Sequence, residues 1–128
     1  MIRMRFNVPM GKIRERMKDK VLIVQKKIAF DLLEGIVNMT PVDTGRARGN
    51  WQVALTAPDL SADWEKKDKA GSGTIMAGAG TINSLQDYGA IYLTNNLPYI
   101  AALEKGRSSQ APAGMVQLSL DRVTAGLR

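Results

Sequence analysis

The chain has 128 residues, 45% of them hydrophobic, and a formal net charge of +6. This length fits one domain, residues 1–128, whose modest core folds without disulfides or metals. The sequence contains no Cys and no His, which excludes thiol chemistry, imidazole acid–base catalysis and nearly every zinc or haem site. No run of about 18 apolar residues is present, and the N-terminus lacks the apolar core of a signal peptide, so we expect a cytoplasmic protein with no membrane partner.

The charge is unevenly distributed along the chain. Residues 1–50 carry eleven Lys or Arg and five Asp or Glu, whereas residues 51–128 carry seven of each. All of the excess positive charge therefore precedes Trp51. A basic segment of this kind favours an acidic partner, either nucleic acid or the acidic surface of another protein, and is equally typical of a solvated helix face.

The first nine residues alternate apolar and basic side chains. Ile2, Met4 and Phe6 recur with the period of a half-buried strand, and Pro9 ends the pattern. Because termini often fray, the sequence leaves open whether residues 1–9 are a strand of the domain or an arm that orders only against a neighbouring subunit.

Residues 10–39 carry the pattern of one long, basic amphipathic helix. Its apolar positions lie three or four residues apart: Ile13, Met17, Val21, Val24, Ile28, Leu32, Ile36 and Met39. Thirty helical residues span about 45 Å, so the helix either overhangs the domain or packs against a copy of itself. Its basic side chains are the candidates for binding a partner: Arg14, Arg16, Lys18, Lys20, Lys26 and Lys27.

A polar elbow, residues 40–50, follows this helix. Pro41 lacks a backbone N–H and disfavours helix at Thr40. Asp43 and Thr44 are suited to accept hydrogen bonds from nearby backbone N–H groups, and Gly45 accepts a positive φ. The sequence therefore predicts a structured turn, and not an irregular loop, between the helix and the body of the domain.

The body, residues 51–128, combines strand and helix patterns. Strands are predicted over 51–56 and 90–95, an exposed and mobile loop over 57–73 with Trp64 as its one apolar anchor, and a short helix or turn within 74–88. A turn at 95–98 leads to a helical turn at 99–106, and Pro112 starts a final helix that extends to Gly126. The predicted fold is α+β, with a long N-terminal helix packed on a small, mainly antiparallel sheet and a C-terminal helix.

No pattern of catalytic or cofactor-binding residues is present. The glycines between residues 71 and 80 are not followed by Gly-Lys-Ser/Thr, and the acidic residues of 57–73 alternate with lysines and match no calcium loop. Ser108 and Ser109 lack a His, a Cys or a nucleophile-elbow motif. We therefore predict that the protein is not an enzyme and has no catalytic residues, no cofactor and no metal site.

Three segments in a fixed order resemble a known family. They are residues 40–51, TPVDTGRARGNW; residues 95–106, NNLPYIAALEKG; and residues 110–116, QAPAGMV. Together with the preceding helix they resemble the tail-component family of long-tailed bacteriophages, which includes head–tail neck and tail-completion proteins and relatives of the minor tail protein Z of lambda. The matching positions are Asp43, Thr44, Gly45, Arg46, Arg48, Trp51, Asn96, Pro98, Tyr99, Glu104, Gly106 and Pro112.

The resemblance implies a structural virion protein at the head–tail junction, a neck, tail-completion or terminator protein. Such a protein assembles in the host cytoplasm as a homo-oligomeric ring, a hexamer or another multiple. The implied partners are further copies of the chain, connector, tail-terminator or tail-tube proteins, and genomic DNA that passes through the channel. None of the matched residues is catalytic in the family.

Two contacts are expected if the matched segments meet in the fold. Glu104 is expected to pair with Arg46 or Arg48, and Trp51 and Tyr99 are expected to form the core beneath them.

An alternative from another class is a nucleic-acid-binding protein that places the basic N-terminal helix on phosphates. Phe30 is the one aromatic residue of that helix, so the pattern permits phosphate contact without base reading. This alternative predicts an affinity for duplex that falls steeply with the logarithm of the salt concentration.

Overall fold

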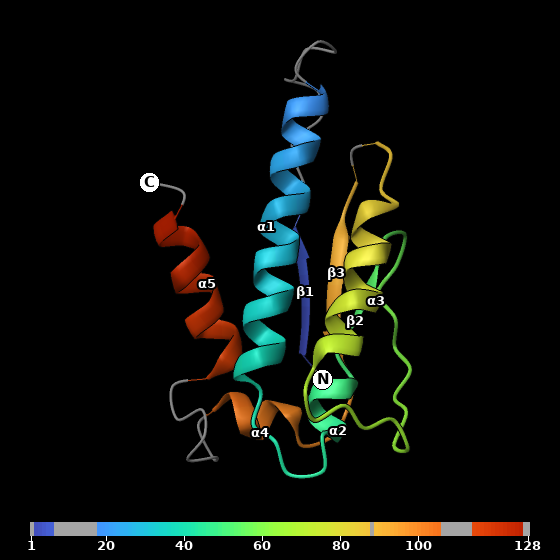
Figure 1. Cartoon of the computed structure of the whole chain (residues 1–128), viewed down its shortest axis with the longest axis vertical. Coiled ribbons are helices and arrows are strands. Elements are labelled where there is room, and N and C mark those ends of the chain that lie inside the picture. The colour runs from blue at the N-terminus through green and yellow to red at the C-terminus, as the bar shows by residue number, and fades with distance from the viewer. Residues whose placement is uncertain (1, 7–17, 88, 106–113, 127–128) are drawn as a thin grey trace.

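The computed structural model describes residues 2–6, 18–87, 89–105 and 114–126. The elements in these ranges are β1 (Ile2–Phe6), α1 (Lys18–Met39), α2 (Arg46–Gly49), β2 (Gln52–Ala54), α3 (Ser72–Asn83), β3 (Ile91–Asn95), α4 (Ile100–Glu104) and α5 (Met115–Gly126). The α+β fold predicted from the sequence is confirmed, with a long N-terminal helix, a small antiparallel sheet and a C-terminal helix (Figure 1). Among the described helices, none combines the length and the apolar character needed to cross a membrane.

The sheet has the strand order β1-β3-β2, and both pairs are antiparallel. Met4 and Val53 both pair with Leu93, which places these three side chains on the face that packs against the helices. Residues 2–6 are therefore a strand of their own domain, and for them an arm that orders only against a neighbour is not needed; residues 1 and 7–9 of the predicted segment lie outside the described ranges. The reason is that their alternating pattern finds a complete antiparallel partner in β3.

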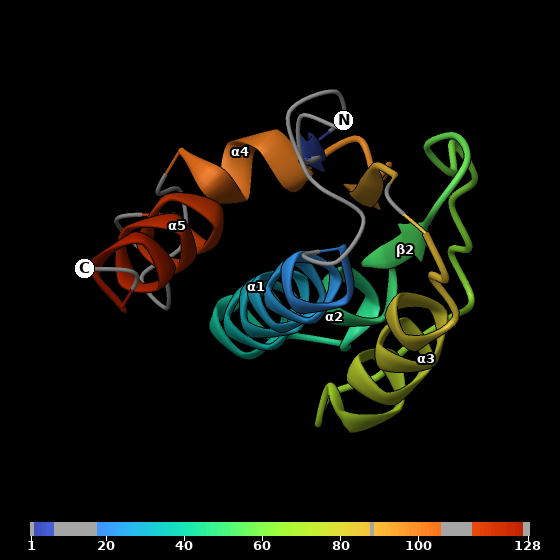
Figure 2. The same cartoon turned by 90° about the horizontal axis from the view of Figure 1, so that it is seen from above.

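Helix α1 supplies most of the helical side of the core. Its buried apolar residues are Ala29, Leu32, Leu33, Ile36 and Val37. Only Leu32 and Ile36 of these belong to the predicted stripe, and Val24 of that stripe is 52% exposed, so the buried face is turned relative to the prediction. The buried residues pack against the inner face of the sheet, where Ile91 and Leu93 are fully buried. Figure 2 shows α3 and α5 on opposite sides of α1. The helix ends at Met39, as predicted, and its 22 described residues span about 33 Å; residues 10–17 of the predicted helix lie outside the described ranges.

Helix α3 begins at Ser72, within the segment predicted to be loop. The side chain of Asp68 explains this start, because it accepts hydrogen bonds from the backbone N–H of Gly71 (2.9 Å) and from both the N–H and the hydroxyl of Thr74 (2.8 Å each). Partial burial raises the pKa of Asp68, but the bonds from Thr74 and Gly71, together with the charge of Lys66, outweigh it and hold the pKa below its usual value. Asp68 thus caps the helix from outside it.

The loop between β2 and α3 is exposed as predicted, but hydrogen bonds attach it to the outer face of the sheet. Thr94 and Asn96 donate to the carbonyl of Asp59 at 2.9 and 2.8 Å, and Gln52 donates to that of Ser61 at 2.6 Å. The prediction of a mobile loop overlooked these side chains, because their direction depends on the register of β2 and β3. The loop covers part of the sheet face that lies opposite α1.

Strand β2 is shorter than the predicted strand 51–56, and β3 agrees with its prediction to within one residue. The predicted helical turn at 99–106 is α4, and the predicted final helix is α5.

Candidate functional site

The elbow and the second matched segment meet at one corner of the molecule. The Asn95 amide donates to the carbonyl of Ala47 at 2.9 Å, although the two residues are 48 positions apart. Pro41–Ala47 also line a pocket of about 340 Å³ together with Tyr99 and Leu103. We call this the elbow pocket, and it brings together segments that sequence resemblance alone had linked.

The local conformation of the elbow is largely as predicted. Gly45 has φ +89°, and a Cβ there would lie 2.6 Å from the backbone nitrogen of Lys69, so both the conformation and the space require glycine. The Thr44 hydroxyl accepts from the N–H of Arg46 at 3.2 Å, at the start of α2. Asp43 is exposed and makes no hydrogen bond within the described residues.

The two aromatic residues expected beneath the elbow have different environments. Trp51 is 2% exposed and donates its indole N–H to the Thr40 hydroxyl at 2.9 Å, which confirms its place in the core. Tyr99 is half-buried, and its ring meets that of Trp64 edge-on with centroids 6.2 Å apart. Tyr99 therefore links the core to an exposed aromatic surface.

The predicted ion pair between Glu104 and the elbow arginines is wrong. Arg48 donates instead to three backbone carbonyls, those of Asn38 (2.8 Å), Thr40 (2.9 Å) and Lys69 (2.8 Å). Arg46 donates to the Trp64 carbonyl at 2.6 Å, with its guanidinium 5.3 Å from the centre of the indole ring. Backbone acceptors at the end of α1 have no partner within the helix, and the guanidinium supplies one.

Glu104 acts at a different place, the start of α5. Its carboxylate accepts from the backbone N–H groups of Val116 (2.8 Å) and Gln117 (3.1 Å). These N–H groups carry partial positive charge and have no acceptor within the helix, so a carboxylate is their favoured partner. Gly114 has φ +87°, and a Cβ there would lie 2.5 Å from the Glu104 carbonyl oxygen.

The remaining matched positions are structural or lie outside the described ranges. Asn96 donates to the carbonyls of Asp59 and Ser61, and Pro98 is exposed. Gly106 and Pro112 lie outside the described residues.

The described lysines of the long helix do not form one free cationic surface. Lys18 pairs with Asp87 and Lys27 with Asp31, each at 3.1 Å. Lys26 donates to the carbonyl of Asn83 at 3.0 Å, and Lys20 is exposed. Arg14 and Arg16 lie outside the described ranges. Three of the four described lysines therefore already contact other parts of the chain.

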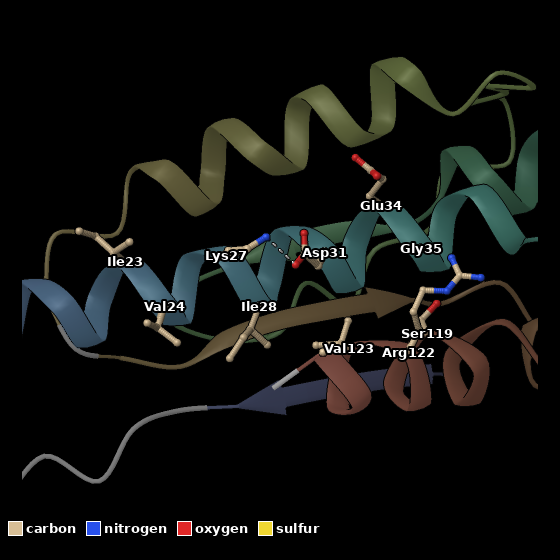
Figure 3. Close-up of a pocket in the computed structure, with 11 residues that line it drawn as sticks. Ile23, Val24, Lys27, Ile28, Asp31, Glu34, Gly35, Ser119, Arg122 and Val123 are labelled. Carbon is tan, nitrogen blue, oxygen red and sulfur yellow. Dashed lines mark hydrogen bonds and ion pairs between the residues drawn. The ribbon is translucent and has the colours of Figure 1, made fainter. Parts of the chain in front are cut away.

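A second candidate site, which the sequence did not predict, is an apolar groove between α1 and α5 with a volume of about 430 Å³. We call it the α1–α5 groove (Figure 3). Val24 and Ile28 of α1 point toward α5, and Val123 of α5 points back toward Ile28. Ile23 and Val24 are 67% and 52% exposed, which is unusual for β-branched apolar side chains on a helix.

The two helices that form this groove approach each other most closely where Gly35 of α1 meets Ser119 of α5. A Cβ on Gly35 would lie 2.9 Å from the Ser119 hydroxyl oxygen, so the bare backbone of Gly35 lets α5 pack against α1. The periodic pattern of α1 had identified Val24 and Ile28 as part of its apolar stripe, but not which neighbour would cover them.

Within the described ranges, no group of three or more acidic side chains is placed to hold a metal ion. Comparisons with protein-family models, with curated proteins and with solved structures find no match to this chain. The arrangement of the two sites is suited to contacts between macromolecules, because one is a joint of packed segments and the other an open apolar groove.

Proposed function

We propose that this chain is a structural subunit of the head–tail junction of a tailed bacteriophage, acting in neck formation or tail completion as a homo-oligomeric ring. The basis for the family is the order of the three matched segments. One observation supports a structural role: the matched residues build the corner where the elbow, β3 and α4 meet. Their charged groups are engaged with backbone, as Arg48 binds three carbonyls and Glu104 caps α5.

Because these charged side chains are bonded to backbone groups, they favour a structural protein over an enzyme or a nucleic-acid-binding protein. A charged side chain that binds phosphate presents its charge to the ligand, whereas Arg48 and Glu104 are engaged with backbone groups of the fold. The lysines of α1 support the alternative, phosphate binding, less than their number suggests, since Lys18, Lys26 and Lys27 all have partners in the chain.

The test is to delete the gene for this chain from the phage genome that encodes it and to examine the resulting particles by electron microscopy. We expect DNA-filled heads and separate tails that do not join, and joining restored when the unaltered chain is supplied in trans. An epitope-tagged chain is expected at the head–tail junction. Normal joined particles without the chain, or virions that do not contain it, would refute the proposal.

A further inference from the structure

Residues 59–63, in the loop after β2, form a segment that we call the strap. It contains no turn or bend. The carbonyl groups of Asp59, Ser61 and Asp63 all accept hydrogen bonds from side chains of the domain, at 2.6–2.9 Å. The N–H groups of Ser61 and Asp63 are bonded as well, to the carboxylate of Asp59 and to the side chain of Asn50. Every second residue of the strap thus has its backbone groups satisfied within its own subunit.

The residues between them leave the other edge of the strap free. In an extended segment the N–H and C=O of one residue point to the same side, and neighbouring residues point to opposite sides. Leu60 and Ala62 therefore direct their backbone groups away from the domain. Leu60 is 65% exposed, Ala62 is also exposed, and neither has a hydrogen-bond partner within the described part of the chain. The strap thus has the free hydrogen-bonding groups of a sheet edge.

Strand β1 provides a second free edge. It is the end strand in the order β1-β3-β2, and among the described strands only β3 pairs with it. Arg3 and Arg5 lie on the outer face of the sheet, both exposed and without an ion pair in the described ranges. The β3 residues opposite them, Thr94 and Tyr92, are uncharged. A strand that pairs with the free edge of β1 therefore meets two positive charges that no neighbouring strand neutralises.

The strap carries the opposite charge. Asp59 and Asp63 are its charged residues, and both lie on the same side because they are separated by an even number of positions. Each carboxylate accepts hydrogen bonds within the loop through Oδ1, which leaves Oδ2 for a further donor. Hydrogen bonds from the hydroxyl and the N–H of Ser61 hold the pKa of Asp59 below its usual value, so this group is ionised at neutral pH.

The basic residues closest to the strap in the sequence or in space lie outside its length. Lys66 and Lys67 follow the turn at residues 64–65. Arg46 donates to the Trp64 carbonyl and lies over the indole ring. The strap itself, residues 59–63, contains no basic residue and has a formal charge of −2 from its two aspartates.

We propose that the strap of one copy of this chain adds as a strand to the free edge of β1 in a second copy, with its aspartates opposite the arginines of β1. The two segments match in length, since each has five residues. Pairing between identical segments is disfavoured, because two β1 strands bring arginines together and two straps bring aspartates together. The proposal rests on the function proposed above and deepens it, because it names the interface of the ring.

Such a contact joins different surfaces of the two copies. The loop that follows β2 and strand β1 lie at opposite sides of the sheet (Figure 2). Each subunit therefore offers its strap to one neighbour and its β1 edge to another. This arrangement generates a closed ring or an open helix and not a two-fold dimer.

A charge exchange between the two segments tests the contact in the full-length chain. The variants Arg3→Glu/Arg5→Glu and Asp59→Lys/Asp63→Lys each bring like charges together when they associate with themselves. Each alone should associate at least about tenfold more weakly than the unaltered chain, measured by sedimentation velocity at low salt. An equimolar mixture should recover the association of the unaltered chain, because every contact between unlike copies again joins opposite charges.

A matched control is Lys20→Glu/Lys105→Glu. Both lysines are exposed and lie outside the strap and β1, and the pair changes the net charge as much as the arginine variant does. Association of this control should remain close to that of the unaltered chain.

A proline substitution tests the backbone hydrogen bonds separately from the charges. Ala62→Pro removes an N–H that the added strand needs and that has no partner within the described part of its own chain. It should weaken association at least about tenfold, whereas Ala62→Ser keeps the N–H and should have little effect. Circular dichroism and thermal unfolding of both variants in dilute solution should match those of the unaltered chain, since position 62 is exposed.

Three results would overturn the proposed interface. They are a mixture of the charge variants that associates no more tightly than either alone, undiminished association of Ala62→Pro, and an unaltered chain that is monomeric at every concentration. None of them decides the proposed function, since the particle experiment measures head–tail joining without reference to this contact. If joining depends on the chain while the interface fails, the ring uses another surface.

Discussion

Single residues at the elbow show how backbone groups compete with ion pairs. Sequence reasoning paired Glu104 with the arginines because opposite charges in two matched segments attract. In the fold, each charge is closer to a helix end. Arg48 binds carbonyls at the end of α1, and Glu104 binds N–H groups at the start of α5. Backbone N–H and C=O groups at a buried or half-buried helix end cost free energy when they lack a hydrogen-bond partner. These charged side chains therefore bond to the helix ends and not to each other.

Asp68 provides a residue-scale prediction with a pH dependence. Its pKa is lower in the folded chain than its ordinary value of 3.8, so its stabilising effect is fully present above that value and is lost as the pH falls through the folded pKa. Asp68→Ala should lower the free energy of unfolding by about 1 kcal/mol at neutral pH, as for other helix caps. Urea unfolding of both proteins should show the difference shrinking as the pH falls below 3.8.

A matched control for this prediction is Asp43→Ala. Asp43 is exposed and makes no hydrogen bond within the described residues, so its replacement should change stability by less than about 0.5 kcal/mol. Equal effects of the two substitutions, or a difference that does not vary with pH, would contradict the capping role of Asp68.

At the scale of elements, the packing of α3 on α1 depends on one glycine. A Cβ on Gly78 would lie 2.4 Å from a methyl carbon of Leu33 and 3.0 Å from one of Val53. Helix α3 therefore sits close to both α1 and β2, and this contact orients its outer face. The glycine-rich segment, predicted to be a short helix or turn, is a helix whose small residues permit close packing.

Substitution of two glycines in α3 separates packing from helix propensity. Gly78→Ala should lower the free energy of unfolding by about 1–3 kcal/mol, because the added methyl overpacks the core. Gly80→Ala should leave stability unchanged or raise it by up to about 1 kcal/mol, since a Cβ at Gly80 meets nothing within 4 Å. Denaturant unfolding of dilute protein measures both, and similar effects at the two positions would show that this packing is wrong.

At the scale of the whole molecule, the first strand completes the sheet as one of its two edge strands. Strand β1 pairs with β3 along its full length, and Ile2 and Met4 pack against the core. A strand that is remote in sequence from its partner thus completes the inner face on which α1 rests. The same pairing places Arg3 and Arg5 on the outer face, where both are exposed.

Removal of residues 1–6 tests whether this strand belongs to its own subunit. The truncated chain should lose at least about 2 kcal/mol of unfolding free energy, from the apolar area of Ile2 and Met4 alone. In dilute protein the loss should be independent of protein concentration, because the strand pairs within one chain. A stability difference that grows with concentration in this range would instead indicate an arm exchanged between subunits.

The sequence by itself determined the α+β class, the end of the long helix at Met39, the elbow with its positive-φ glycine and the burial of Trp51. These features follow from local rules, since the period of apolar residues and the backbone limits of Pro41 and Gly45 act within a few positions. Only the tertiary structure decided the partners of Arg48 and Glu104, the attachment of the 57–71 loop and the groove between α1 and α5. Each of these depends on which distant segments become neighbours. A periodic pattern predicts which face of a helix or strand is apolar, but it does not predict which other element covers that face.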